Sequence, residues 1–200
     1  MNAPTLVAHT ALGDVGYREV GDGSSIVLIT GFGASMDNWA PSFVDALAAH
    51  HRVVVFDNAG VGETAPPAGP LTVSGMADQT SALISALCLH RPAVLGWSIA
   101  GIPEYPALYG ASPAVRVDQD AAIAEWMAGD DPSGPEVGRI HVPILIADGA
   151  QDALDPAPDA SILAHAVHGA PAMLFPDAGH AFPLPRLSSI RAGPELVRRL

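Results

Sequence analysis

The chain has 200 residues, of which 49% are apolar and 15% charged, and its formal net charge is −12 at pH 7. This length suits one domain and this apolar content supplies a sizeable core, so an intrinsically disordered chain is excluded. All of the basic residues are arginines, and they are too few for a basic face, so nucleic acid is not expected as a partner.

No apolar run approaches the roughly 18 residues of a membrane span, and no basic region precedes an apolar stretch near the first residue. We therefore expect no membrane partner and no signal peptide, and a cytoplasmic protein. The single cysteine, Cys88, lies in the apolar helical stretch Ser81–Leu89, where we expect a buried, inert thiol.

The predicted elements begin with a hairpin around the turn Gly13-Asp14 and continue with alternating strands and helices. The expected strands are Leu6–Ala11, Val15–Val20, Ile26–Ile29, Arg52–Phe56, Ala93–Leu95, Val142–Ala147 and Ala172–Phe175. The expected helices are Pro41–Ala49, Thr72–Leu89, Ile99–Tyr109 and Pro158–Val167. This order predicts an α/β fold in one domain, a three-layer α/β/α sandwich with a mainly parallel sheet.

A serine, Ser98, lies in a tight turn between a predicted strand and a predicted helix. The turn Gly96-Trp97-Ser98-Ile99-Ala100 reads G-x-S-x-A, whereas the usual nucleophile elbow is G-x-S-x-G. Small residues are needed there because the backbone around such a serine is strained and crowded. The pentapeptide alone is a weak signal, and its position after an apolar strand strengthens it. An ordinary turn serine is the alternative.

Several segments in register with this turn resemble the α/β-hydrolase superfamily, and the resemblance covers nearly all of Ile26–His180. Ile29–Gly33 is similar to the oxyanion loop after the third strand, and Phe56–Gly62 is similar to the D-x-R-G-x-G turn, with Ala59 in the arginine position. Asp148–Asp152 with Pro156 matches the segment that supplies the triad acid, and Asp177–His180 matches the segment that bears the triad histidine. The resemblance implies a minimal α/β-hydrolase-like fold.

The resemblance also implies a catalytic triad in the order Ser98, Asp152, His180. A serine hydroxyl needs a base within hydrogen-bond reach, and an imidazole oriented by a carboxylate can take and return its proton. The backbone N–H groups of Phe32 and Ile99 are expected to form the oxyanion hole, with Gly31 and Trp97 at the substrate. No cofactor and no metal are expected.

Three alternatives stay open at the residue level. His180 could be a surface histidine, and Asp155 competes with Asp152 for the role of the acid, although it could instead cap the next helix. His165 and His168 share a predicted helix face, but no third metal ligand is evident, so we interpret both as solvated.

The segment between nucleophile and acid is short for the family, which usually places a sixth strand and a helical cap there. Pro113–Val117 is similar to the beginning of that strand, and 118–134 is expected to be the remnant of the cap. Unpaired buried backbone is costly, so we expect Val115–Val117 to form a strand stub or the sheet to close up. We expect Val142–Ala147 to keep paired neighbours on both sides. A strand stub or a closed sheet could each move Asp152 away from His180.

Hydrolysis of small carboxylic esters through an acyl-serine intermediate is the leading functional hypothesis, and the missing cap predicts an open pocket that prefers short acyl chains. The alternative is a shortened, non-catalytic relative that binds a ligand or a partner chain. The reduced cap favours this alternative, and the complete set of triad residue types opposes it. A homo-oligomer whose second chain covers exposed sheet is compatible with both.

Overall fold

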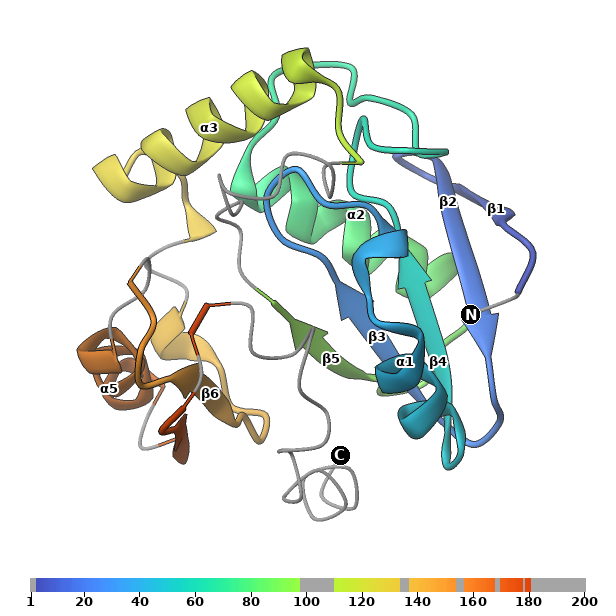
Figure 1. Ribbon diagram of the computed structural model, residues 1–200. Helices are drawn as coiled ribbons and strands as arrows, with labels where there is room; N and C mark the ends of the chain where they lie inside the picture. Colours follow the sequence, from blue (N-terminus) through green and yellow to red (C-terminus); the bar gives the residue numbers. More distant parts are fainter. Residues whose placement is uncertain are drawn as a thin grey trace.

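The computed structural model describes residues 3–97, 110–133, 137–153, 157–167, 170–177 and 179–180. Its strands are β1 (Leu6–Thr10), β2 (Gly13–Val20), β3 (Ser24–Ile29), β4 (His51–Phe56), β5 (Ala93–Gly96), β6 (Ile146–Gly149) and β7 (Ala172–Phe175). Its α-helices are α1 (Pro41–Ala48), α2 (Val73–Ala86), α3 (Pro113–Ala128) and α5 (Ala157–Ala166), with short 3₁₀ turns at Met36–Asn38 and Val137–Arg139. Figure 1 shows their arrangement.

Five strands form one sheet in the order β1-β2-β4-β3-β5. The hairpin β1–β2 and the pair β2–β4 are antiparallel, whereas β3 runs parallel to both β4 and β5. Ile26 in β3 lies opposite Val53 on one side and Ala93 on the other. The central strands are continuous apolar runs because both faces of the sheet are covered, as the sequence predicted.

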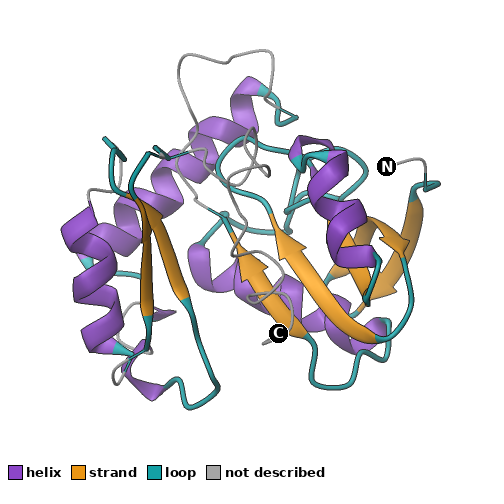
Figure 2. Ribbon diagram, turned by 60° about the horizontal axis from the view of Figure 1, so that its bottom comes forward, coloured by secondary structure: helices purple, strands orange, loops and turns teal. Residues whose placement is uncertain are grey.

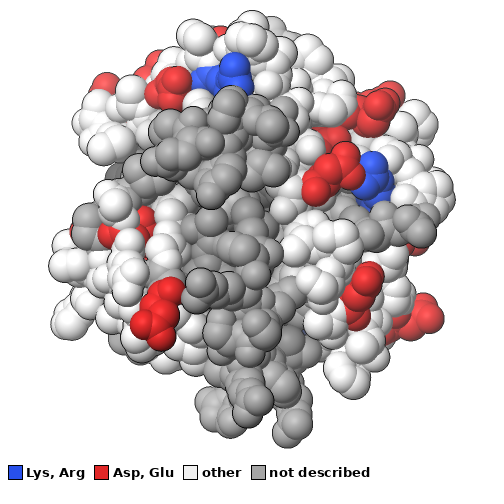
Figure 3. All heavy atoms as spheres, in the orientation of Figure 1, with Lys and Arg blue, Asp and Glu red and all other residues white. Residues whose placement is uncertain are grey.

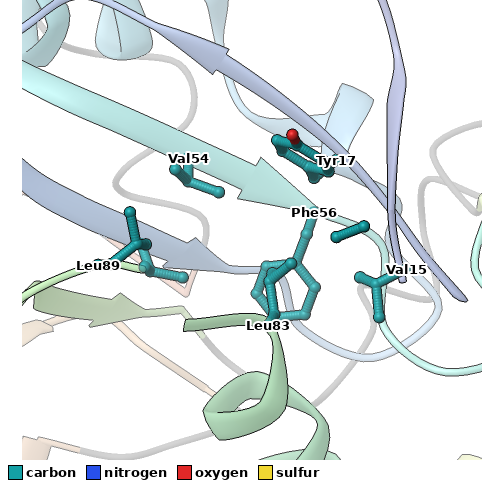
Figure 4. Packing of buried hydrophobic residues seen from close by; sticks show 8 residues of the cluster. Val15, Tyr17, Val54, Phe56, Leu83 and Leu89 are labelled. Carbon is teal, nitrogen blue, oxygen red and sulfur yellow. The ribbon is translucent and has the colours of Figure 1, made fainter. Parts of the chain in front are cut away.

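Alternate residues of β4 pack into two cores on opposite faces of the sheet. Val54 and Phe56 join the core that includes Leu83 of α2, and Figure 4 shows these side chains converging with Val15 of β2. The other core contains Val53 and Val55 of β4, Ile26 and Leu28 of β3, and Val44 and Leu47 of α1. Helices therefore cover both faces, and the predicted three-layer α/β arrangement is confirmed.

β6 and β7 form a separate two-stranded parallel sheet, and α5 packs on it through Ala160 and Ala164 against Ile146. Figure 2 shows this pair beside the five-stranded sheet. Within the described ranges, no strand joins β5 to β6. The expectation that β6 pairs on both sides is therefore wrong, as is the expectation that the sheet closes up.

The predicted strand stub at Val115–Val117 is also wrong, because these residues belong to the first turns of α3. Ser112 is the N-cap of this helix, and its hydroxyl accepts a hydrogen bond from the N–H of Val115 at 3.3 Å, while Pro113 occupies the first helical position. A serine followed by proline is a typical helix start, and it outweighs the β-branched residues that follow.

Two smaller predictions need correction. The strand expected from Val142 begins only at Ile146, and Val142 is 68% exposed. Pro143 has no N–H to give to a ladder and restricts the residue before it, so pairing starts beyond it. Cys88 is exposed rather than buried: it follows the C-cap of α2 with φ = 51°, outside the helix that was expected to bury it.

Acidic side chains are scattered over the face of the molecule shown in Figure 3, and basic ones occupy only small areas of it. This distribution agrees with the net charge of −12. Among the described helices, none is long and apolar enough to cross a membrane.

Candidate active site

An acid–histidine pair lies at the carboxyl ends of β6 and β7. Oδ2 of Asp152 is 2.8 Å from Nδ1 of His180, and the two side chains are 3% and 9% exposed. An ionised carboxylate only accepts hydrogen bonds, so Nδ1 carries the proton and donates it to Asp152. This contact fixes the tautomer and the orientation of the imidazole ring. Nε2 is then the ring nitrogen that would accept and return a proton.

The two loops that carry this pair are joined to each other directly. The N–H of Ala150 donates to the carbonyl of Phe175 at 2.9 Å, and the Gln151 side chain donates to the carbonyl of Pro176 at 3.3 Å. Because β6 and β7 are parallel neighbours, their carboxyl ends lie at the same edge of the two-stranded sheet. The missing sixth strand therefore does not separate Asp152 from His180.

The predicted nucleophile Ser98 and the predicted oxyanion donor Ile99 lie outside the described residues, as does Asp155. β5 ends two residues before Ser98, and Trp97 is described. The indole N–H of Trp97 donates to the backbone carbonyl of His180 at 3.0 Å. The residue before the predicted nucleophile is thus bonded to the predicted base, across the gap between the two sheets.

Trp97 is also held on its own sheet. Its backbone N–H donates to the carbonyl of Ile29 at 3.1 Å, and its ring lies edge-on to Trp39, with centroids 6.1 Å apart. Trp39 in turn stacks on Phe43. Contact of the Trp97 ring with a substrate stays a prediction.

The predicted oxyanion loop follows β3 and is a tight turn. The N–H of Ala34 donates to the carbonyl of Gly31 at 3.2 Å, and Gly33 has φ = 67°, a left-handed conformation that favours glycine. Gly31 and Gly33 are buried, and Phe32 is half-buried. The loop therefore has a defined backbone in which the predicted donor, the Phe32 N–H, has a set direction.

Asn58, in the turn after β4, bonds to this loop, and its neighbour Asp57 bonds to the 3₁₀ turn that follows the loop. Asp57 accepts from the N–H of Met36 at 2.7 Å and from the N–H of Glu63 at 3.2 Å, and the Asn58 amide donates to the carbonyl of Thr30 at 2.9 Å. The turn is a structural support for the oxyanion loop. This agrees with its resemblance to the D-x-R-G-x-G turn.

Gln119 of α3 also holds the loop, and sequence reasoning missed it. Its Oε1 accepts from the N–H of Gly33 at 2.7 Å, and the residue is 1% exposed. The available signal was its helical spacing from Ala122, the other buried residue of α3. That spacing does not say what a buried amide bonds to.

The two candidate metal-binding histidines do not form a described site. His165 is exposed and its Nδ1 lies 3.3 Å from the carbonyl of Ser161 in its own helix, and His168 lies outside the described residues. In the part of the chain that the structure describes, no cluster of three or more metal-ligating side chains occurs.

Comparison with known proteins agrees with this architecture. A model of the alpha/beta hydrolase fold family matches residues 25–103, which include β3, β4, β5 and the predicted elbow. A thermophilic esterase from Thermogutta terrifontis superposes with a TM-score of 0.78 at 19% identity, covering 98% of this chain and 99% of that one. The chain therefore has the alpha/beta hydrolase fold.

Curated relatives match the chain in part. RutD of Azorhizobium caulinodans, which is named for carbamate hydrolysis, is 34% identical over 109 residues, 54% of this chain and 41% of RutD. A Synechocystis protein named as a non-heme chloroperoxidase is 26% identical over 130 residues, 63% of this chain and 47% of that protein. The chain thus spans less than half the length of these relatives. The names of these two relatives, a hydrolase and a peroxidase, differ in the reaction that they give.

Proposed function

We propose that this chain is a serine hydrolase that cleaves small carboxylic esters through an acyl-serine intermediate, with Ser98, Asp152 and His180 as its triad. The observation that carries the proposal is the buried contact of 2.8 Å between Asp152 and His180. A histidine ordered by a carboxylate is the arrangement that activates a nearby serine as a nucleophile.

The reaction runs in two halves. Nε2 of His180 removes the Ser98 hydroxyl proton as the serine oxygen attacks the ester carbonyl, and the N–H groups of Phe32 and Ile99 stabilise the resulting oxyanion. The protonated imidazole then gives its proton to the leaving alkoxide, which departs as an alcohol. Water repeats the sequence on the acyl-serine and releases the carboxylic acid. Asp152 stays ionised and stabilises the imidazolium in both halves.

The substrate class is small esters, with Gly31 and Trp97 beside the acyl group. Only α3 and the residues after it stand where the family usually has a cap, which favours short acyl chains and weak discrimination of chain length. Carbamate hydrolysis is a second candidate, supported by the similarity to RutD, and it uses the same acyl-transfer chemistry. A cytoplasmic location and a homo-oligomeric state stay predictions.

Labelling by a fluorophosphonate probe tests the proposal without knowledge of the substrate, because the probe reacts only with an activated serine. We expect the wild-type chain to be labelled and to hydrolyse p-nitrophenyl acetate faster than p-nitrophenyl octanoate. Ser98→Ala should abolish both activities while circular dichroism shows an unchanged fold. An aryl carbamate assayed in parallel separates the two candidate substrates.

A wild-type chain that is folded but neither labelled nor active on any of these substrates would overturn the proposal and favour a non-catalytic binding protein. Undiminished hydrolysis by highly purified Ser98→Ala would instead show that another residue is the nucleophile.

A further inference from the structure

The predicted oxyanion loop is supported by a helix that carries none of the proposed catalytic residues. This helix, α3, runs across the top of the view in Figure 1. Gln119 lies in its second turn and is among the largest fully buried side chains of the described chain. Burying a primary amide is costly unless its polar atoms are bonded, so its position in the core requires a specific partner.

That partner is the backbone of the loop. The Gln119 carbonyl oxygen accepts from the N–H of Gly33 at 2.7 Å, and the carbonyl of Gly33 accepts from the N–H of Ala111 at 3.0 Å. Both polar groups of the Gly33 backbone are therefore held by the segment from Gly110 through α3. A Cβ on Gly110 would overlap the side chain of Ser35, so this segment packs directly on the loop.

We propose that Gln119 is a positioning residue that sets the direction of the oxyanion-hole N–H of Phe32, an inference that rests on the proposed serine-hydrolase function. The peptide plane that carries the Gly33 N–H and the plane that carries the Phe32 N–H meet at the Cα of Phe32, so holding the first plane restricts the second through the backbone dihedrals of Phe32. The hydrogen bond to Gln119 holds the first plane.

The consequence is specific to the transition state. An oxyanion forms only as the serine attacks, and a donor that points away by about 1 Å loses most of its effect on the rate without weakening ground-state binding. Loss of the Gln119 acceptor should therefore lower kcat and leave KM nearly unchanged.

Gln119→Met tests the proposal because methionine keeps the length of the side chain and removes the acceptor. We expect kcat for p-nitrophenyl acetate to fall by about 10- to 100-fold with KM within about threefold of wild type. Affinity for a trifluoromethyl ketone, which forms an oxyanion adduct with the serine, should fall by a similar factor. The Gly33 amide should exchange its proton faster in NMR spectra of the variant.

Gln79→Met is the matched control. Gln79 is a buried glutamine of α2, and its Oε1 has no hydrogen-bond partner among the described residues, so its removal should leave kcat, KM and Gly33 exchange as in wild type. Equal kinetic effects of the two substitutions in folded proteins would overturn the proposal, as would a loss confined to KM.

If Gln119→Met does not fold, Gly110→Ala tests the same contact by pushing the segment away from Ser35, and a wild-type kcat in that variant would overturn the proposal. A wild-type chain without esterase activity or probe labelling would refute the proposed function and with it the catalytic role of Gln119. Amide exchange at Gly33 would still report whether Gln119 holds the loop, so the two failures are distinguishable.

Discussion

Asp57 illustrates how one buried side chain supports the site without taking part in chemistry. Burial raises the pKa of its carboxyl group, and the hydrogen bonds from the N–H groups of Met36 and Glu63 offset part of this rise. A group whose pKa rises on folding favours the folded state at low pH and loses that contribution as pH increases through its folded pKa. The contribution of Asp57 near neutral pH is therefore to join the two segments whose N–H groups donate to it.

Asp152, in contrast to Asp57, is proposed to take part in the chemistry, because its contact with His180 sets the histidine tautomer. Asp152→Asn should lower kcat by about 10⁴-fold, as a wrong tautomer does in other triads, while the melting temperature changes little. Steady-state kinetics on p-nitrophenyl acetate measure the effect. Asp155→Asn is the control and should retain most of the activity; a larger loss there would assign the acid to Asp155.

Among the elements, α3 is anchored at both ends to other parts of the fold. Val115 in its first turns packs close to Gly60, and Asp131, just beyond its C-terminus, bonds to the first turn of α2. Asp131 accepts from the backbone N–H of Ser74 at 3.1 Å and from the N–H of Ser133 at 2.8 Å. A carboxylate at a helix N-terminus is also favoured by the helix dipole.

The stability conferred by Asp131 should depend on pH. Its burial alone would raise its pKa, but the hydrogen bonds from Ser133 and Ser74 outweigh burial and lower the pKa to about 2 from its ordinary 3.8. A carboxylate with a lowered pKa stabilises the fold fully above its unfolded pKa and loses this contribution as pH falls through its folded pKa. The stabilisation is therefore present at pH 7 and declines between about pH 4 and pH 2.

Thermal unfolding of Asp131→Asn across this range tests that dependence. At pH 7 the variant should melt several degrees below wild type, and the difference should shrink as pH falls from about 4 to about 2. The neighbouring Asp130 makes no side-chain hydrogen bond within the described ranges, so Asp130→Asn should follow the wild-type curve. A constant difference at every pH would show that Asp131 does not act through its charge.

At the scale of the whole molecule, the protein divides its candidate site between two sheets. Strand β5, which precedes the predicted nucleophile, belongs to the five-stranded sheet, whereas the predicted acid and histidine follow β6 and β7 of the other. The Trp97 bond to the His180 carbonyl bridges them. The proposed activity would therefore depend on how well this hydrogen bond holds His180 against Trp97, the residue before the predicted nucleophile.

Trp97→Phe should expose this dependence, because phenylalanine keeps a ring against Trp39 and removes the N–H. One neutral hydrogen bond contributes about 1 kcal/mol, so we expect kcat to fall by about fivefold and the rate of fluorophosphonate labelling to fall with it. Trp39→Phe is the control, because the buried indole N–H of Trp39 has no partner in the described part of the chain. Similar losses in both variants would indicate altered packing instead of a lost bridge.

Local patterns were sufficient for much of this protein. Neighbouring residues alone define the hairpin turn, the continuous apolar runs of β3 and β4, and the apolar spacing in α2. The apolar residues of these elements are the ones expected to be buried. The candidate acid and histidine were predicted by the resemblance of their segments to those of the family, and the structure brings their side chains together. Ser112 and Pro113 are also a readable N-cap signal, although the β-branched residues after them favour a strand.

Long-range contacts decided the rest. Whether a shortened sheet closes, keeps a stub or divides depends on competing backbone pairings between segments 50 or more residues apart, and no local pattern ranks them. The bonds from Gln119 to Gly33 and from Trp97 to His180 join residues separated by 86 and 83 positions. Their partners are backbone groups, which are chemically alike at every residue, so only the folded chain selects which ones meet.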